Sequence, residues 1–176
     1  MTEIKDIVKA YKSEERNKIH PFSEWSRREV FEKLVRPFLV AMGYNPDQIN
    51  YDDTKGIVEL KIREDLKIVV YVSSIQEEQR FLSNKTGAPV DTLPDPETGK
   101  PKYEMAIVTN FEKWFFYFDG KEIYAVAGER LEEEYDTVKL LISRDAMESG
   151  GFREVARKLL HKEDNEPLRQ ELNVLR

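Results

Sequence analysis

The stretch GIVELKIREDLKIVVYVSS, residues 56–74, decides the fold class of this chain. Its first part, residues 56–62, alternates apolar residues with Glu59 and Lys61, and this period of two predicts a strand with one buried face. Its second part, residues 67–72, is apolar on both faces and predicts a central strand. Because only REDL separates the two parts, we expect them to form a hairpin.

Patterns on both sides of the hairpin indicate further helices and strands. Helices are expected where apolar residues recur every three or four positions, and strands where β-branched and aromatic residues cluster. The chain therefore belongs to the α+β class, with a central mixed β-sheet flanked by helices. The expected helices are residues 3–17, 23–43, 73–87 and 150–161, and the other expected strands are residues 103–110, 113–118, 122–128 and 137–143.

The second expected helix carries its own boundary signals. Ser26 followed by Glu29 matches a capping box, and Gly43 supplies a C-terminal stop. Pro37 lies inside this helix, where it removes one backbone hydrogen bond and is expected to bend the axis.

Length and composition limit the kind of protein. A chain of 176 residues fits one domain, which we divide into an N-terminal helix (1–20), a core (21–145) and a C-terminal helical tail (146–176). The absence of cysteine excludes disulfides and thiolate metal sites. A net charge of −6 argues against a dedicated nucleic-acid binder, because such proteins neutralise phosphates with Lys and Arg. Without a signal peptide or a long apolar run, the chain is expected to be cytoplasmic and to have no membrane partner.

Three stretches of the chain carry a resemblance to a known family. EVFEKLVRPFLVAMGY (29–44) ends in Gly and an aromatic residue, GIVELKIREDLKIVVYV (56–72) is the hairpin, and AIVTNFEKWFFYF (106–118) turns between two strands. They are similar to the first helix, the hairpin and the Thr-Asn-Gly strand turn of the N-terminal nuclease domain of type I restriction enzyme R subunits, in the PD-(D/E)xK superfamily. The resemblance spans about residues 24–120 and implies a restriction-endonuclease-like fold.

The resemblance also implies a metal site that this sequence lacks. Active members place a carboxylate on the first hairpin strand and a Glu-x-Lys at the end of the second, where they hold Mg²⁺ and orient water. Here the second-strand positions fall on Tyr71, Val72 and Ser73, or one residue later on Val72, Ser73 and Ser74. In the next helix Gln79 matches the family, but a serine replaces its Tyr. The sequence thus predicts a degenerate site, with a serine capping that helix.

A different set of residues keeps catalysis open. NYDDTKGIVELK contains Asp53 followed by Glu59 and Lys61, which supply an acid and a Glu-x-Lys. With Glu32 or Glu29 from the preceding helix, Asp53 and Glu59 would provide oxygen ligands for Mg²⁺. In the alternative interpretation, Glu59 and Lys61 form the solvated face of an alternating strand, and DDTKG is a turn.

Other polar and aromatic groups have ordinary interpretations. His20 and His161 lie far apart in sequence and suggest neither a triad nor a zinc site. The aromatic run at residues 114–117 is interpreted as a buried strand, and not as a platform for bases. The acidic run ERLEEEYD (129–136) is interpreted as a solvated loop, with contact to a basic partner as the functional alternative. The Pro-rich stretch at residues 88–101 is expected to be a surface loop.

Three functions follow from these observations. The leading hypothesis is a catalytically inactive nuclease-fold domain that binds a protein, with DNA less favoured by the net charge. Such a domain would suit a phage or other mobile element, in the host cytoplasm or in a virion. The second is a Mg²⁺-dependent DNA endonuclease, the only case in which a cofactor is expected. The third is a structural or assembly protein of a larger particle, which would use the acidic run and the terminal helices.

Overall fold

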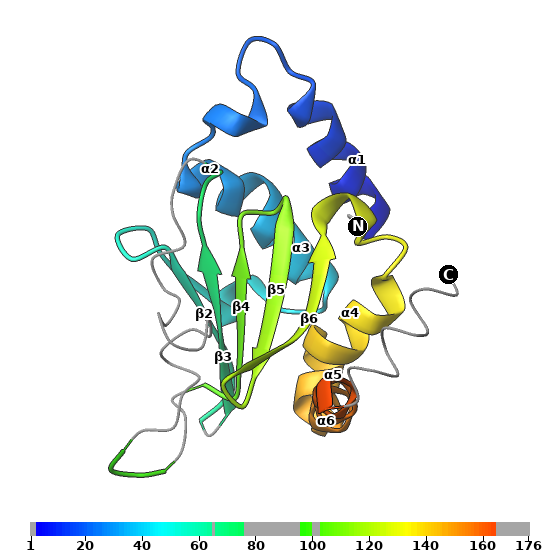
Figure 1. The fold of residues 1–176 in the computed structure, drawn as a ribbon. Helices are drawn as coiled ribbons and strands as arrows, with labels where there is room; N and C mark the ends of the chain where they lie inside the picture. Colours follow the sequence, from blue (N-terminus) through cyan, green and yellow to red (C-terminus); the bar gives the residue numbers. More distant parts are fainter. Residues whose placement is uncertain (1–2, 65, 76–95, 100–102, 165–176) are drawn as a thin grey trace, which may run out of the picture.

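A computed structural model describes residues 3–64, 66–75, 96–99 and 103–164, and these residues form one six-stranded mixed sheet (Figure 1). The strands lie in sequence order across the sheet, with β1 and β6 at its edges. All neighbours pair antiparallel except β3 and β4, which are parallel. The α+β class with a central mixed sheet is therefore confirmed. The strands are β1 (Ile49–Asp52), β2 (Ile57–Arg63), β3 (Leu66–Val72), β4 (Met105–Thr109), β5 (Lys113–Phe118) and β6 (Lys121–Ala127).

The hairpin of β2 and β3 is confirmed, and its register decides which side chains share a face. Glu59 pairs with Val69, while Val58 and Leu60 on β2 belong to the core between the sheet and the helices. Since side chains alternate along a strand, Glu59 lies on the opposite face of the sheet. There Val69 packs in a second, smaller cluster with Tyr71 of β3 and with residues of β4 and β5. β3 is thus buried on both faces, as its sequence predicted.

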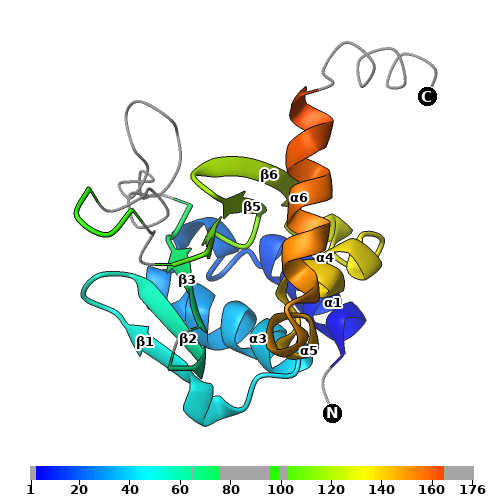
Figure 2. The same ribbon diagram turned by 90° about the horizontal axis from the view of Figure 1, so that it is seen from below.

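Helices cover one face of the sheet, and α6 packs against β6 with its axis crossing the strand (Figure 2). The core between them contains fully buried aromatic residues such as Phe31, Phe38 and Trp114. α1 contributes Ile7 and Val8 to this same core. The helices are α1 (Ile4–Glu15), α2 (Arg27–Val30), the π-helix η2 (Phe31–Val35), α3 (Arg36–Ala41), α4 (Tyr135–Ile142), α5 (Arg144–Ser149) and α6 (Gly151–Asp164), with short 3-10 helices η1 (Phe22–Glu24), η3 (Pro46–Gln48) and η5 (Gly128–Arg130).

The helical segment from α2 to α3 has the expected boundaries and an irregular middle. The Ser26 side chain accepts from the Glu29 amide at 3.2 Å, and the Glu29 carboxylate accepts from the Ser26 amide, so the capping box is confirmed. Gly43 ends the segment with a φ of +101°. The predicted irregularity near Pro37 takes the form of the π-helical turn η2, which precedes it. A proline ring clashes with the carbonyl four residues earlier, and a widened turn gives that carbonyl room.

The prediction of a strand at residues 137–143 was wrong, because these residues belong to α4 and its C-terminal end. Val138, Leu141 and Ile142 are buried together at a spacing of three and four residues, which is helical. The acidic run before them was predicted to be a loop; it starts in η5, continues through turns and enters α4. Short apolar runs fit both a strand and a helix, so only packing distinguishes them.

The remaining segments include one strand that was not predicted, one that was, and stretches that the structure does not describe. β1 was not predicted, although it forms the edge strand beside β2. The aromatic run at residues 114–117 is a strand, with Trp114 and Phe116 fully buried. Residues 73–75, at the start of the predicted helix 73–87, are not helical, and residues 76–87, including Gln79, lie outside the described residues together with most of the Pro-rich stretch. Among the described helices, none has the length and apolarity that crossing a bilayer requires.

Candidate functional site

A cleft of about 550 Å³ lies at the carboxyl end of β3, where the degenerate motif was predicted. Ser74 forms one wall, and Arg27, Arg28 and Glu29 from the start of α2 form another. Asp53, from the turn between β1 and β2, also lines the cleft. The cleft therefore mixes cations and carboxylates from three segments that are distant in sequence.

The motif positions at the end of β3 are buried, and they contribute packing and backbone hydrogen bonds to the sheet. Tyr71 belongs to the second cluster, and Val72 packs on the helix-facing side. The Val72 amide donates to the Gly56 carbonyl at 2.8 Å, and the Ser73 amide donates to the Thr109 carbonyl at 3.0 Å. Ser73 and Ser74 are 4% and 5% exposed. These positions offer hydroxyls, which are poor substitutes for the carboxylates that bind Mg²⁺.

The Arg27 side chain fills the space that a side chain at Gly56 would occupy, beside the end of β3. A side-chain carbon added at Gly56 would lie 2.6 Å from Arg27 Nη1 and 2.8 Å from the Val72 carbonyl oxygen. Arg27 Nη2 also approaches the Thr54 carbonyl oxygen at 3.5 Å. The guanidinium thus places a fixed positive charge next to the strand end. A positive charge at this point repels a divalent metal ion and makes its binding there less favourable.

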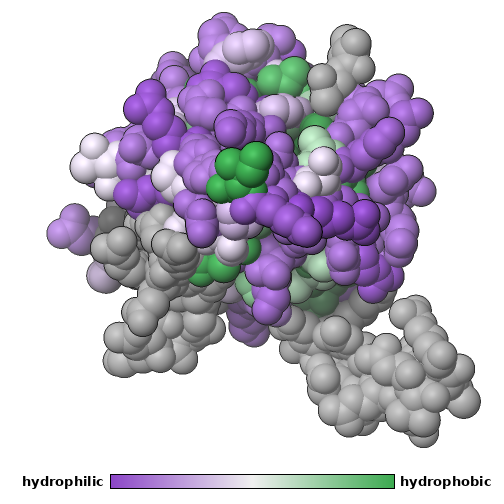
Figure 3. All heavy atoms as spheres, turned by 90° about the horizontal axis from the view of Figure 1, so that it is seen from above, coloured by the Kyte–Doolittle hydropathy of each residue, from purple (hydrophilic) through white to green (hydrophobic). Residues whose placement is uncertain are grey.

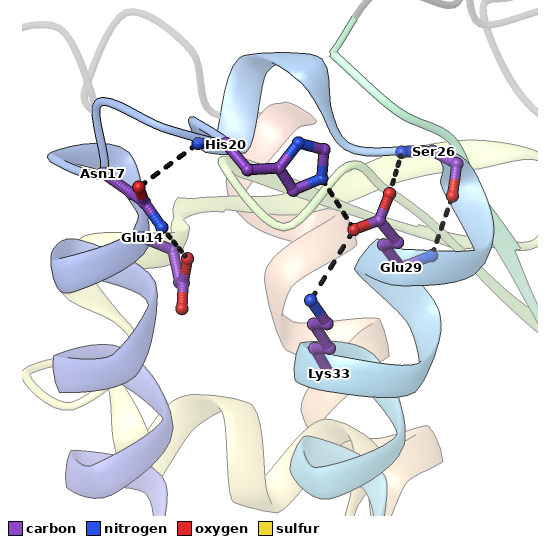
Figure 4. A network of polar contacts seen from close by, with 6 residues as sticks. All are labelled: Glu14, Asn17, His20, Ser26, Glu29 and Lys33. Carbon is purple, nitrogen blue, oxygen red and sulfur yellow. Dashed lines mark hydrogen bonds and ion pairs between the residues drawn. The ribbon is translucent and has the colours of Figure 1, made fainter.

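Glu29 joins the loop after α1 to the start of α2 (Figure 4). Its carboxylate lies 2.8 Å from His20 Nε2 and 3.6 Å from Lys33 Nζ, and it accepts from the Ser26 amide at 3.2 Å. Desolvation acts to raise the pKa of Glu29, but the bonds with His20 and Ser26 and the charge of Lys33 outweigh it and lower that pKa. Glu29 is therefore a structural carboxylate that closes this side of the cleft.

The lowered pKa of Glu29 predicts a pH-dependent contribution to stability. A carboxylate whose folded pKa is depressed stabilises the fold above its unfolded pKa and loses that contribution as the pH falls through the folded value. We expect Glu29→Gln, which keeps a capping amide, to lower the free energy of unfolding by about 1 kcal/mol at neutral pH. Urea unfolding at neutral and acidic pH measures this difference, which should vanish in acid.

The matched control is Glu24→Gln, since Glu24 is an exposed carboxylate that makes no ion pair among the described residues. Its substitution should change stability by less than about 0.5 kcal/mol at either pH. If Glu29→Gln lowered the stability equally at neutral and acidic pH, the lowered pKa of Glu29 would not be the source of the effect.

The alternative catalytic residues do not come together. Asp53 accepts from the Tyr51 hydroxyl at 2.6 Å on the helix side, where the Tyr51 ring stacks on Phe31. Glu59 accepts from the Tyr103 hydroxyl at 2.7 Å on the other face of the sheet. The sheet therefore separates the two acids that were predicted to share a metal.

The remaining residues of that predicted metal site are engaged elsewhere. Lys61 pairs with Glu64 at 2.8 Å, and this bond raises the pKa of Lys61. Glu32 pairs with Arg36 at 3.2 Å on the surface of the helical segment. Within the part of the chain that the structure describes, no three His, Asp or Glu side chains form a group that could hold a metal ion.

Two buried polar atoms near the cleft make no hydrogen bond within the described residues. They are the indole Nε1 of Trp25, which lines the cleft, and the hydroxyl of Ser73, next to Ser74. An unmade hydrogen bond on a buried group costs about 1–3 kcal/mol. The sequence did not indicate Trp25, Arg27 and Arg28 as members of the site. The start of α2 and the end of β3 are distant in sequence, and they meet only in the fold, at the turn that contains Gly56.

No family model, curated protein or solved structure that was compared with the chain matches it.

Proposed function

We propose that this chain is a catalytically degenerate domain of the restriction-endonuclease-like type that acts by binding a protein partner. The observation that carries the proposal is the end of β3. Where the resemblance requires Glu-x-Lys, the chain has Val72, Ser73 and Ser74, with the guanidinium of Arg27 beside them. A scaffold without its metal ligands can keep a binding role, since function depends on the site and not on the fold.

The turn between β4 and β5 supports the resemblance. The family has Thr-Asn-Gly at this turn, and this chain has Thr109, Asn110 and Phe111. Phe111 has a φ of +69°, a backbone conformation that favours glycine and is rare for an aromatic residue. The chain thus keeps the backbone of a glycine turn at the position where the family has glycine.

The cleft supports binding to a protein more than binding to DNA. Arg27 and Arg28 are offset there by Glu24, Glu29 and Asp53, so the lining does not present one sign of charge. DNA affinity depends on neutralising successive phosphates, which a cleft of mixed charge does poorly. Protein surfaces offer both signs of charge together with hydrogen-bond donors and acceptors.

The proposal predicts that the purified protein cleaves no DNA. Linear and circular DNA should stay intact with Mg²⁺ or Mn²⁺, and neither ion should shift the melting temperature, since only a ligand that prefers the native state raises stability. Glu59→Ala and Lys61→Ala serve as matched variants. Metal-dependent cleavage that both substitutions abolish would overturn the proposal and favour the endonuclease hypothesis.

The binding role is tested by cross-linking in the source cells. A partner captured by the wild-type protein should be lost with Arg28→Glu, which reverses an exposed charge in the cleft, and kept with Lys121→Glu, an exposed charge at the start of β6. Equal capture by both variants would show that the cleft is not the binding site.

A further inference from the structure

A stripe of four exposed cations runs along α1, on a chain whose net charge is −6. Lys5, Lys9, Lys12 and Arg16, the last at the C-cap of α1, follow one another at spacings of four, three and four residues. At 3.6 residues per turn they fall within about 60° of the helix circumference, and they extend over about 16 Å. We call these four residues the basic stripe. Lys5 pairs with Glu3 at 3.4 Å, and the other three make no ion pair within the described residues.

An acidic surface lies directly beside the basic stripe. It comprises Glu129 in η5 and Glu132 in the following turn, and Figure 1 shows this part of the chain, in yellow, next to α1. A groove of about 430 Å³ is lined by the basic stripe together with Val8 and Glu132. Both acids are exposed, and neither makes an ion pair within the described residues. The two charge sets are therefore neighbours that no ion pair joins within the described residues.

Two neighbouring patches of opposite charge form a self-complementary surface. We propose that a second copy of this chain docks here, so that the basic stripe of each copy faces Glu129 and Glu132 of the other about a two-fold axis. A two-fold interface uses the same patch on both subunits, and each contact then occurs twice. Both the basic stripe and Glu132 line the groove, so in this arrangement each of them faces the opposite charge of the other copy.

The large apolar side chains that are exposed among the described residues do not line this groove. They are Ile19, which is 94% exposed, Leu140, which is 54% exposed, and Val40, which is 40% exposed. Elsewhere, the face seen from above in Figure 3 is mostly hydrophilic, with hydrophobic groups in separate spots. Charge complementarity, and not a large apolar patch, is thus the feature that selects the partner.

A polyanion fits this groove less well than a second copy does. Glu132 lies on the groove wall and would repel successive phosphates, whereas it gains cationic partners in a two-fold pair. The proposal concerns a surface away from the cleft at β3, and it does not depend on the proposed function.

Sedimentation of the full chain at low and high salt tests the proposal. A dimer should form at low salt and dissociate as salt rises, because the Debye length falls from about 10 Å at 0.1 M to about 3 Å at 1 M. Lys9→Glu with Lys12→Glu, or Glu129→Lys with Glu132→Lys, should each raise the dissociation constant at least about tenfold. A chain that carries all four reversals should dimerise again, and a mixture of the two double variants should form a heterodimer.

The control variant is Lys55→Glu with Lys121→Glu, which changes the net charge by the same amount as the reversal on α1 at exposed positions of the turn after β1 and of β6. It should dimerise like the wild type. A protein that stays monomeric at low salt, or a dimer that the two reversals leave intact, would overturn the proposal. Single-stranded DNA bound by a monomeric wild type and lost with the α1 reversal would assign the stripe to nucleic acid instead.

Discussion

Gly128→Ala is expected to unfold this protein or to lower its free energy of unfolding by about 4 kcal/mol or more. A side-chain carbon at Gly128 would lie far inside the van der Waals distance of the Phe111 carbonyl oxygen, which is backbone and cannot rotate away. That carbonyl also accepts from Trp114 Nε1 at 3.0 Å, and the Gly128 amide donates to the Glu112 carbonyl at 2.8 Å. The substitution therefore forces the turn between β4 and β5 away from η5.

Soluble yield and urea unfolding measure this effect, which corresponds to a loss of about 10 °C in melting temperature for a chain of this size. Gly151→Ala is the control, because Gly151 is exposed at the start of α6 and, among the described residues, an added carbon would meet only Ser149 Oγ, at 3.3 Å. Alanine favours a helix over glycine, so stability should stay equal or rise slightly. A Gly128→Ala protein within about 1 kcal/mol of the wild type would contradict the packing of the turn.

Gly56→Ala is expected to cost about 3 kcal/mol and to open the cleft. Gly56 has a φ of +68°, a conformation that costs a residue with a side chain about 1–2 kcal/mol. The added carbon would also approach the Val72 carbonyl oxygen at 2.8 Å and Arg27 Nη1 at 2.6 Å. The turn must therefore shift, and Arg27 must leave its place at the end of β3. Urea unfolding measures the loss of stability.

Gly99→Ala separates the cost of the backbone conformation from the cost of the close contacts. Gly99 has a φ of +70°, and no atom of the described residues lies within 4 Å of the added carbon. It should lose only about 1 kcal/mol. Arg27→Ala in the Gly56→Ala background should recover part of the loss, because it removes one of the two close contacts. Equal losses for Gly56→Ala and Gly99→Ala would show that Arg27 and Val72 do not crowd the turn.

Part of the candidate site could be predicted from the sequence, namely the end of β3. The apolar run at residues 66–72 identifies a central strand, and the serines after it carry hydroxyls in place of the carboxylates that bind Mg²⁺ best. That Arg27 and Trp25 line the same cleft could not be predicted, because this depends on where the start of α2 lies relative to the turn at Gly56. The separation of Asp53 from Glu59 could not be predicted either, because it depends on which side of the sheet each side chain faces. Six residues apart in sequence, they lie on opposite sides of the sheet.

The sequence by itself determined the α+β class, the central hairpin and the boundaries of the long helical segment. Periods of two and of 3.6 residues, capping residues and turn glycines act over a few positions, so they can be recognised locally. Only the tertiary structure decided that residues 137–142 are helical, that Arg27 lies beside Val72, and that α1 lies next to η5. These outcomes depend on which segments bury their apolar faces against each other, and that choice involves residues far apart along the chain.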